Sequence, residues 1–470
     1  MIPKETATKI LAAALHTGGD LAEIYVEDRT LLNLRLEESK LEEAVRGADR
    51  GAGVRVLFGN LAAYAYTDDL SQKSLLQAAR AAAAAASGSS KAQVIDLTHR
   101  PSPLEFPVAK PFESLSVTDK AQMLHLIDRT ARGFDPHVSQ VFATYGEMRR
   151  RVWIYNSEGL HVQDDRNMLE VKVMVLAQKN GIIQRARQGF GGQMGLELLD
   201  ANDPVALSRE LAGTAVQMLD AHPAPAGEMT VVINNGWGGV LFHEACGHAM
   251  EADFVSKGSS AYAGMLGQRV ASPLITAVDD GTIPGRRGSL RFDDDGTPSS
   301  RTVLIEDGIL REYMWDLVEA RRMNRQSTGN GRRQSFRHMP LPRMTNTYIA
   351  AGPHDPQEII RSVKKGLYVK RLGGGQANIA KGDFVFRVTE GYLIENGKLT
   401  TPVRGATITG NGPQVLSEID RVGTDFALDP GIGMCGKGQS ARVNVGQPTI
   451  RIPRLTVGGT DQEVSGTQGM

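Results

Sequence analysis

Two histidines and a glutamate lie within six residues of one another in the segment VLFHEACGHAMEADFV, as His243, Glu244 and His248. Zinc hydrolases need neutral imidazoles to hold the ion, an open position for water and a carboxylate that takes the proton of that water. The segment therefore predicts that His243 and His248 bind zinc and that Glu244 is the catalytic base. On the motif alone, a buried helix with two incidental histidines remains an alternative.

The spacing of the two histidines differs from that of the common H-E-x-x-H helix. In that helix the histidines are at i and i+4, about 40° apart around the axis. His243 and His248 are at i and i+5, which is about 140° apart on an ideal helix. A helix that brings both rings to one ion must be deformed between them, by a π-bulge or by ending early. Gly247 is a residue that tolerates such a deformation.

A catalytic zinc site usually has a third protein ligand. The sequence offers four candidates: Cys246, Glu251, His338 and Cys435. Cys246 lies inside the motif and is better interpreted as a small buried apolar residue. Glu251 could be a ligand, or it could accept a hydrogen bond from an imidazole N–H, a supporting role that Asp253 could also take.

Cys435 lies in the glycine-rich segment PGIGMCGKGQSA. Glycines allow close backbone approach, and the neighbouring Lys437 is expected to lower the pKa of the thiol, so a thiolate ligand is one use of this loop. The segment also resembles the phosphate-binding pattern G-x-x-x-x-G-K. However, Gly438 stands where that pattern needs Ser or Thr, and the chain continues as a strand and not as a helix. We therefore disfavour nucleotide binding.

Residues 321–343 contain seven arginines and no acidic residue. Such a segment could bind nucleic acid, form a solvated loop, or face the substrate and hold a peptide carboxylate. Because no nucleic-acid module is recognisable, we favour the third hypothesis. It makes these residues candidates for substrate binding: Arg337, His338, Arg343 and Asn346.

The composition excludes several classes of protein. The 53 basic and 53 acidic side chains cancel, so there is no general attraction to nucleic acid or to an anionic membrane. Two cysteines cannot form a disulfide framework. No apolar run is long enough to cross a membrane, and the first twenty residues predict an amphipathic helix rather than a signal peptide. We expect a cytoplasmic protein.

The pattern of elements predicts two domains, as the length of 470 residues also does. Before residue 221 we expect four strand segments over 22–66 with a hairpin turn at Gly59-Asn60, then strands over 138–189. Helices are expected over 69–86, ended by the sequence SGSS, after an N-cap at Thr118, and over 204–220. This order is typical of an α+β domain with an antiparallel sheet.

The second domain is expected to begin at residue 222. The segment AHPAPAGEM, residues 221–229, has two prolines and no periodicity, which suits an exposed linker. Beyond it the chain is rich in strands and glycines, and it carries the metal-motif helix. Two segments, LIEDGILREYM and LIENGKLTTPV, each contain a turn sequence between strands and predict hairpins.

Four motifs together resemble the TldD/PmbA family of metallopeptidases, on the TldD side. They are HEACGHAMEADFV, SFRHMPLPRMTNTYI, GGGQANIAKGDFVF and GMCGKGQ, which occur in this order and span most of residues 225–450. The resemblance implies a two-domain fold, a zinc ion and hydrolysis of unfolded or linear peptides. It also implies that His243 and His248 are ligands, that Glu244 is the base and that Cys435 is the third ligand.

The resemblance further implies a dimer, either of identical chains or with a PmbA/TldE-like subunit that lacks the metal motif. We expect no direct action on nucleic acid and no membrane association. Two alternative functions remain: a non-catalytic subunit or regulator of a peptidase complex that merely retains metal, and a nucleic-acid-associated regulator. The presence of Glu244 favours the enzyme, because a structural zinc site closes with four ligands and needs no free carboxylate.

Overall fold

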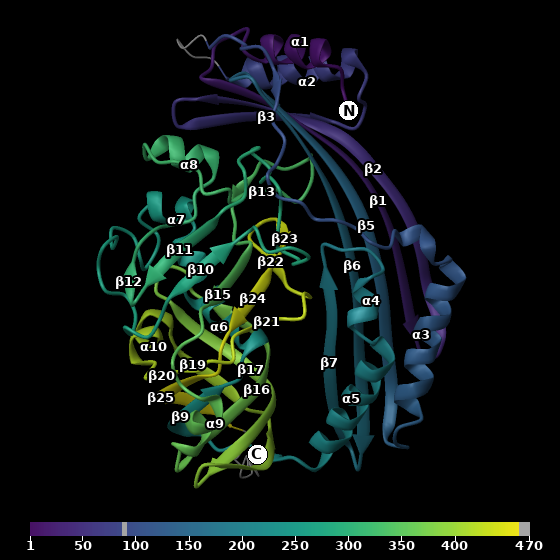
Figure 1. Cartoon of the computed structure of the whole chain (residues 1–470), viewed down its shortest axis with the longest axis vertical. Coiled ribbons are helices and arrows are strands. Elements are labelled where there is room, and N and C mark those ends of the chain that lie inside the picture. The colour runs from purple at the N-terminus through teal and green to yellow at the C-terminus, as the bar shows by residue number, and fades with distance from the viewer. Residues whose placement is uncertain (87–91, 460–470) are drawn as a thin grey trace, which may run out of the picture.

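The computed structural model describes residues 1–86 and 92–459, so the predicted SGSS helix stop lies outside the described residues. A long curved sheet built by the N-terminal part of the chain runs along one side of the molecule, and a β-rich C-terminal part lies beside it (Figure 1). The predicted α+β class is confirmed.

The N-terminal sheet has seven strands and is antiparallel except for the parallel pairing of β4 with β6. Its order is β3-β2-β1-β5-β6-β4, and β7 also pairs with β6. The strands are β1 Leu21–Glu37, β2 Lys40–Phe58, β3 Leu61–Thr67, β4 Thr98–His99, β5 Val138–Asn156, β6 Leu160–Lys179 and β7 Ile182–Gly192. The hairpin turn at Gly59-Asn60 is confirmed, since it joins β2 to β3.

Of the four strand segments expected over residues 22–66, the first two form one long strand, β1, and the third joins the start of the fourth in a second long strand, β2. The polar residues that were interpreted as strand ends remain in the ladder, where Arg29 of β1 pairs with Asp49 of β2. An ion pair of 3.0 Å joins their side chains. A cross-strand pair of opposite charge stabilises strand pairing as apolar pairs do. The strand can therefore continue through a stretch where the alternation of apolar residues is interrupted.

Helices cover the two ends of this sheet. Helices α1 (Lys4–Ala14) and α2 (Gln72–Ala85) share an apolar core with β1 and β2 at one end, and α3 (Val117–Arg132) and α5 (Pro204–Gln217) share another core with β5 and β6 at the other end. The N-cap of α3 is Ser116 and not Thr118, because Ser116 and Asp119 form a reciprocal capping box. Across residues 1–86 and 92–459, no helix has both the length and the apolar character that a membrane crossing requires.

The C-terminal part is built around a closed ring of strands. Strands β16, β9, β25, β19 and β17 pair in that order, and β17 pairs back to β16. Strand β18 extends this sheet from β17, β8 pairs with β18, and β20 pairs with β25. The bounds are β8 His222–Pro223, β9 Gly227–Ile233, β16 Lys365–Ala377, β17 Asp383–Glu395, β18 Lys398–Arg404, β19 Thr407–Asn411, β20 Arg421–Val422 and β25 Ile450–Gly458.

A second sheet has six strands in the order β12-β11-β10-β15-β24-β21. Its strands are β10 Ala277–Asp280, β11 Arg301–Glu306, β12 Ile309–Leu310, β15 Asn346–Ile349, β21 Ala427–Leu428 and β24 Asn444–Gln447. Both predicted hairpins are confirmed, as β11–β12 and β17–β18, and their turn residues Asp307-Gly308 and Asn396-Gly397 have positive φ. The helix α6 (Val240–Ala245) contacts β15 and β24 of this sheet and β16 and β17 of the ring, so it lies between the two sheets.

The segment 221–229 is exposed over much of its length, as expected of a linker, but part of it also pairs in strands. His222 and Pro223 pair with β18, the residues from Gly227 onward form β9, and Ala221 and Ala224 are buried. Because proline can occupy a strand edge, Pro223 is compatible with strand pairing here.

Candidate metal centre

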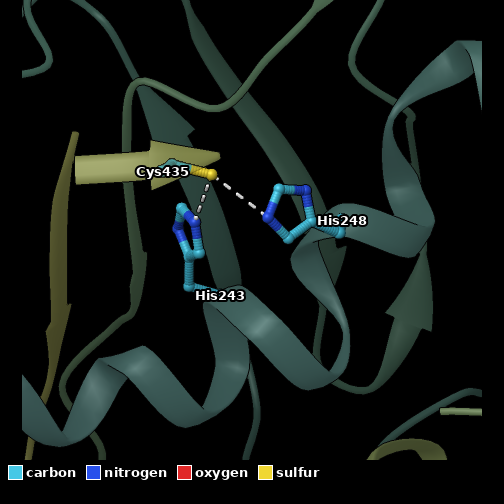
Figure 2. Close-up of side chains that lie close together, drawn as sticks. All are labelled: His243, His248 and Cys435. Carbon is cyan, nitrogen blue, oxygen red and sulfur yellow. Dashed lines mark hydrogen bonds between the residues drawn. The ribbon is translucent and has the colours of Figure 1, made fainter. Parts of the chain in front are cut away.

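Three buried side chains from distant parts of the chain converge at one point. The Nε2 atom of His243 lies 3.2 Å from the Sγ atom of Cys435, and the Nε2 atom of His248 lies 3.1 Å from it (Figure 2). The three donor atoms all lie within 4.8 Å of one another. In the part of the chain that the structure describes, this is the one group of three such residues that could hold a metal ion.

The local backbone explains how two histidines five residues apart reach one point. The α-helix α6 ends at Ala245, and Cys246 leaves the helical region with φ −134° and ψ −44°. His248 follows in a short 3-10 turn, η4 (Gly247–Met250). The predicted deformation is thus confirmed as an early helix end. Gly247 serves packing here, because a Cβ atom at this position would lie 2.5 Å from the Sδ atom of Met344.

Cys435 is held in a β-hairpin formed by β22 (Met434–Gly436) and β23 (Ser440–Arg442). Arg343, which is 1% exposed, donates hydrogen bonds of 2.8 Å to the carbonyl groups of both Cys435 and Gln439. The guanidinium therefore fastens the backbone at both sides of the hairpin turn. The sequence suggests Arg343 as a substrate ligand and gives no sign of this structural role.

The ring of His248 is oriented by an acidic side chain behind it. Its Nδ1 atom lies 2.9 Å from Oε2 of Glu251, so Nδ1 carries a proton and Nε2 is left to face Cys435. Lys437 donates to the same Glu251 oxygen at 2.9 Å and to Asp253 at 2.7 Å. Glu251 thus bonds to both His248 and Lys437, and Asp253 bonds to Lys437. The ammonium group of Lys437 contacts these two carboxylates and not, as the sequence suggests, the Cys435 thiol.

The electrostatics favour anionic forms of two of these groups. Burial raises the pKa of the Cys435 thiol, but the adjacent His243 and His248 rings outweigh it and bring the pKa to about 4. Burial likewise raises the pKa of Glu251, and His248 and Lys437 outweigh it, giving about 2. Burial lowers the pKa of His248, yet Glu251 and Cys435 hold it well above 6.5. This pKa keeps the His248 ring protonated when no metal is bound, so zinc would have to displace that proton. A thiolate beside two neutral imidazoles is then a donor set that suits zinc.

Glu244 lies beside this trio without joining it. Its Oε2 atom is 3.8 Å from Nε2 of His248, and its side chain is 32% exposed. Its neighbour in the chain, His243, projects from the same short helix toward Cys435. Three donors would leave the fourth position of a tetrahedral ion to be filled from outside the chain, next to a carboxylate.

The other suggested site residues have different surroundings. Burial raises the pKa of the Cys246 thiol to about 12, in keeping with its interpretation as an apolar residue. The Nδ1 atom of His338 lies 3.0 Å from the Ser335 hydroxyl. Arg337 makes two bonds to the carboxylate of Asp49, and the buried Asn346 amide donates to Asp280 and Ser289. None of these candidates belongs to the group of three around Cys435.

The arginine-rich segment is mostly exposed in its first part and mostly buried in its second. Arg321, Arg325 and Arg337 are exposed. Arg332, Arg333 and Arg343 are buried, because their guanidinium groups turn inward toward carbonyl and carboxylate oxygens.

Comparison with known proteins gives matches along most of the chain. Three domains of the PmbA/TldA metallopeptidases match: domain 1 over residues 22–86, the central domain over 110–219 and the C-terminal domain over 226–459. The Metalloprotease TldD homolog of Haemophilus influenzae is 43% identical, covering 97% of this chain and 96% of that protein. The Zinc metalloprotease TldD homolog of Saccharolobus solfataricus is 26% identical, covering 96% and 99%.

Two solved structures share the fold. A Thermotoga maritima protein, named for a suggested modulation of DNA gyrase, has a TM-score of 0.80 at 22% identity and covers 97% of this chain and 100% of its own. TldE from Thermococcus kodakarensis has a TM-score of 0.76 at 21% identity, with coverage of 97% and 100%. At these identities the likeness concerns the architecture alone.

Proposed function

The chain belongs to the PmbA/TldD family of metallopeptidases, and from this membership we propose that it is a zinc-dependent peptidase. In this proposal His243, His248 and Cys435 bind the ion and Glu244 is the catalytic base. The observation that carries it is the convergence of three buried donor atoms within 4.8 Å, with a partly exposed carboxylate beside them.

The donor set supports zinc as the metal. One thiolate and two imidazole nitrogens match the ligand types that zinc takes in proteins, and three ligands are typical of its catalytic sites. The bond between Nδ1 of His248 and Glu251 supports the same assignment, because metal-binding histidines usually donate their other N–H to a carboxylate or carbonyl. The name of the Saccharolobus relative also includes zinc.

In the proposed reaction, bound zinc would lower the pKa of the attacking water molecule and polarise the carbonyl group of the peptide bond. Glu244 takes the proton of this water and passes it to the departing amine nitrogen. Its exposed fraction of 32% leaves the carboxylate within reach of water and substrate. Glu251, itself bonded to Lys437, holds the His248 ring, and Arg343 holds the backbone of Cys435, so that the ligands are oriented before substrate arrives.

We further propose that the substrates are linear or unfolded peptides bound as an added strand. The donor side chains are buried, so a segment of a folded protein would have to unfold before its backbone could reach them. Strand β22, which carries Cys435, pairs with β23 alone among the described strands, so its other edge can accept a peptide backbone. Main-chain pairing of this kind gives affinity with little dependence on the sequence of the peptide.

The proposal extends to domains, partners and location. The seven-stranded sheet contains residues only up to 192, and the other sheets begin at 222, which supports a division between domains 1–221 and 222–470. We propose that the chain forms a dimer, either of two such chains or with a TldE-like subunit. A location in the cytoplasm is in keeping with two free cysteines.

The decisive experiment is metal analysis beside peptide cleavage. Purified protein should contain about one zinc per chain, cleave unstructured peptides, lose activity on chelation and regain it when zinc is added. A matched pair of substrates, one stable folded protein and the same protein after irreversible unfolding, tests the substrate class. A chelated protein that still cleaves peptides at full rate would overturn the metal-dependent mechanism.

A further inference from the structure

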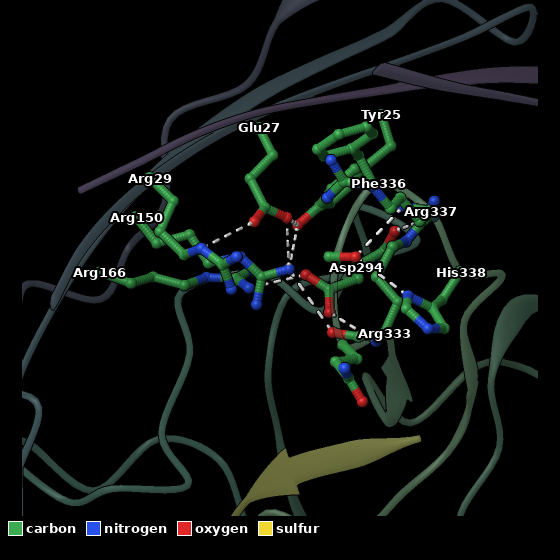
Figure 3. Close-up of polar contacts among 12 residues, drawn as sticks. Tyr25, Glu27, Arg29, Arg150, Arg166, Asp294, Arg333, Phe336, Arg337 and His338 are labelled. Atoms are coloured by element: carbon green, nitrogen blue, oxygen red, sulfur yellow. Dashed lines mark hydrogen bonds and ion pairs between the residues drawn. The ribbon is translucent and has the colours of Figure 1, made fainter. Parts of the chain in front are cut away.

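A cavity of about 200 Å³ lies between the N-terminal sheet and the C-terminal part. Residues of β1, β5 and β6 line one side of it, and residues of β13 (Gly331–Arg332) and of the β22–β23 hairpin line the other. Seven of the lining residues are arginines, and Asp294 is the one acidic residue among them. Figure 3 shows part of this wall, with Arg150, Arg166 and Arg333 gathered near Asp294.

Five of the arginines are neutralised by ion pairs. Arg150 pairs with Glu27, Arg166 with Asp164 and Asp294, Arg333 with Glu23, Arg29 with Asp49, and Arg287 with Glu170. Arg332 and Arg442 have no carboxylate within ion-pair distance among the described residues. Arg332 bonds only to carbonyl groups, those of Met344 and Arg442. The wall of the cavity therefore carries an excess of positive charge.

Several donors at the cavity also lack partners. Gln193 is 3% exposed, and neither atom of its amide group has a hydrogen-bond partner. The Nη1 atom of the buried Arg287 and the Nε atom of Arg442 lack partners too. Burial, with the neighbouring Arg287, also lowers the pKa of Arg442 to about 10, as expected for a guanidinium short of negative charge. Buried donors are normally satisfied, so these groups suit an occupant that brings acceptor oxygens.

The cavity is small, which limits that occupant. Its volume corresponds to several water molecules. It is below the range of roughly 300–1,000 Å³ found for pockets that enclose a drug-sized molecule. The site can therefore take an anionic group, but not a whole ligand of that size. Arginine forks bind planar carboxylates through two parallel hydrogen bonds.

The cavity and the candidate metal centre share the β22–β23 hairpin. Exposed Met434 and Ser440 line the cavity, and both belong to the hairpin that carries Cys435. Neighbouring residues of a strand project to opposite faces, so Met434 borders the cavity while Cys435 faces the two histidines. An extended peptide beside this hairpin can thus present one group to the cavity and its backbone to the metal centre.

We propose that this cavity binds a carboxylate of the peptide substrate, and this inference rests on the proposed peptidase function. The carboxylate is supplied either by the C-terminus of the peptide or by an acidic side chain. Arg442 and Gln193 are its principal recognition groups, and Arg332 contributes positive charge. The sequence suggests Arg337 and Arg343 as the residues that bind a peptide carboxylate. We propose this cavity in their place, because the side chains of those two arginines already have hydrogen-bond partners within the chain.

The test is a binding measurement that requires no turnover. Calorimetry on full-length Glu244→Gln protein would compare three acetylated alanine peptides of equal length: one with a free C-terminus, one amidated, and one amidated with a single internal glutamate. We expect at least one of the two anionic peptides to bind about tenfold or more tightly than the neutral one. The anionic peptide that is favoured identifies the source of the carboxylate.

Two variants make the test specific. Arg442→Met keeps the aliphatic stem, removes a guanidinium that has no ion pair, and should abolish the preference while zinc content stays unchanged. Arg421→Met is the matched control, since Arg421 lies on β20, also lacks an acidic partner among the residues that the structure describes, and is not part of the cavity wall. Equal affinities for all three peptides, or an unchanged preference in Arg442→Met, would overturn the proposal. A binding preference without any cleavage by the wild-type protein would instead count against the peptidase function alone.

Discussion

His243 and Cys435 are 192 residues apart in the chain, yet Nε2 of the histidine lies 3.2 Å from Sγ of the cysteine. Pairing between β9 and β25 accounts for this proximity. Strand β9 leads directly into the segment of α6, and β25 follows the segment of the β22–β23 hairpin, while Ile233 of β9 pairs with Ile450 of β25. Thus the closed ring of strands, and not a local motif, assembles the candidate metal centre.

The first prediction concerns metal content. His243→Ala, His248→Ala and Cys435→Ala should each lose most of about one bound zinc per chain, because each removes one of three donors. The measurement is elemental analysis of purified protein by mass spectrometry. Cys246→Ala is the control, since this buried thiol is outside the group of donors. Full zinc retention in Cys435→Ala would return Glu251 and His338 as candidates for the third ligand.

The second prediction separates the base from the ligands. Glu244→Gln preserves the shape of the side chain but cannot accept a proton, so zinc should remain while the rate of peptide cleavage falls by roughly 10² or more. The measurement is kcat on an unstructured peptide, with zinc content determined on the same sample. Normal cleavage by the zinc-loaded variant would remove Glu244 from its proposed role.

A third prediction concerns the residues behind His248. Glu251→Gln should weaken zinc affinity by about 10–100-fold, because the acceptor that orients the ring loses its charge. Lys437→Met should weaken it less, since Glu251 keeps its bond to His248. The readout is competition for zinc with a chelator of known affinity. If Glu251→Gln bound zinc as the wild type does, the orientation of His248 would have to come from packing alone.

The sequence was informative where the physical cause is local. The spacing of His243 and His248 required a break in the helix, and the break occurs at Cys246. Turn sequences such as Asp307-Gly308 gave hairpins in the expected places, because positive φ favours these residue types. Motif chemistry likewise pointed to Cys435, which the structure brings to the two histidines.

Other features depend on partners that are distant in the chain and could not be predicted. Lys437 is two residues from Cys435, yet its ammonium group bonds to Glu251 and Asp253, 186 and 184 residues away. Arg343 resembles any arginine of an exposed loop until the fold places it against the hairpin of Cys435. The middle of β1 was interpreted as a break because the partner of Arg29, Asp49, is supplied by the next strand.

The fourth prediction tests the packing of the helix break. Gly247→Ala places a Cβ atom 2.5 Å from Sδ of the buried Met344, so it should lower the free energy of unfolding by about 1–3 kcal/mol and weaken zinc binding. Met344→Ala alone should also destabilise the protein by leaving a cavity. The double variant should be more stable than the sum of the two single losses in unfolding free energy implies, because alanine at position 344 makes room for the methyl group added at position 247. Additive effects in urea unfolding would show that this contact is not the reason for glycine.

The last prediction concerns how the free energy of unfolding depends on pH through an ion pair between the N-terminal sheet and the C-terminal part. Glu170 of β6 accepts a hydrogen bond from Lys172 and pairs with the buried Arg287 at 2.6 Å. Burial raises the pKa of Glu170, but Arg287 and Lys172 outweigh it and bring the pKa from 4.5 to about 2. The folded-state pKa is therefore below the unfolded value, so the ionised carboxylate stabilises the fold fully above pH 4.5, and this stabilisation is lost as the pH falls toward 2.

Glu170→Gln removes this titration and leaves Arg287 without its acidic partner. At pH 7 the variant should be less stable by roughly 1–3 kcal/mol, and the difference from the wild type should shrink steadily between pH 5 and pH 3, since the wild type alone loses the contribution of the ionised Glu170. Urea-unfolding midpoints at pH 7, 5, 4 and 3 measure this. Glu42→Gln, at an exposed position of β2, should leave the pH dependence as in the wild type. A constant difference between Glu170→Gln and the wild type over this range would mean that the carboxylate contributes packing and not charge, because only a charged contribution disappears on protonation.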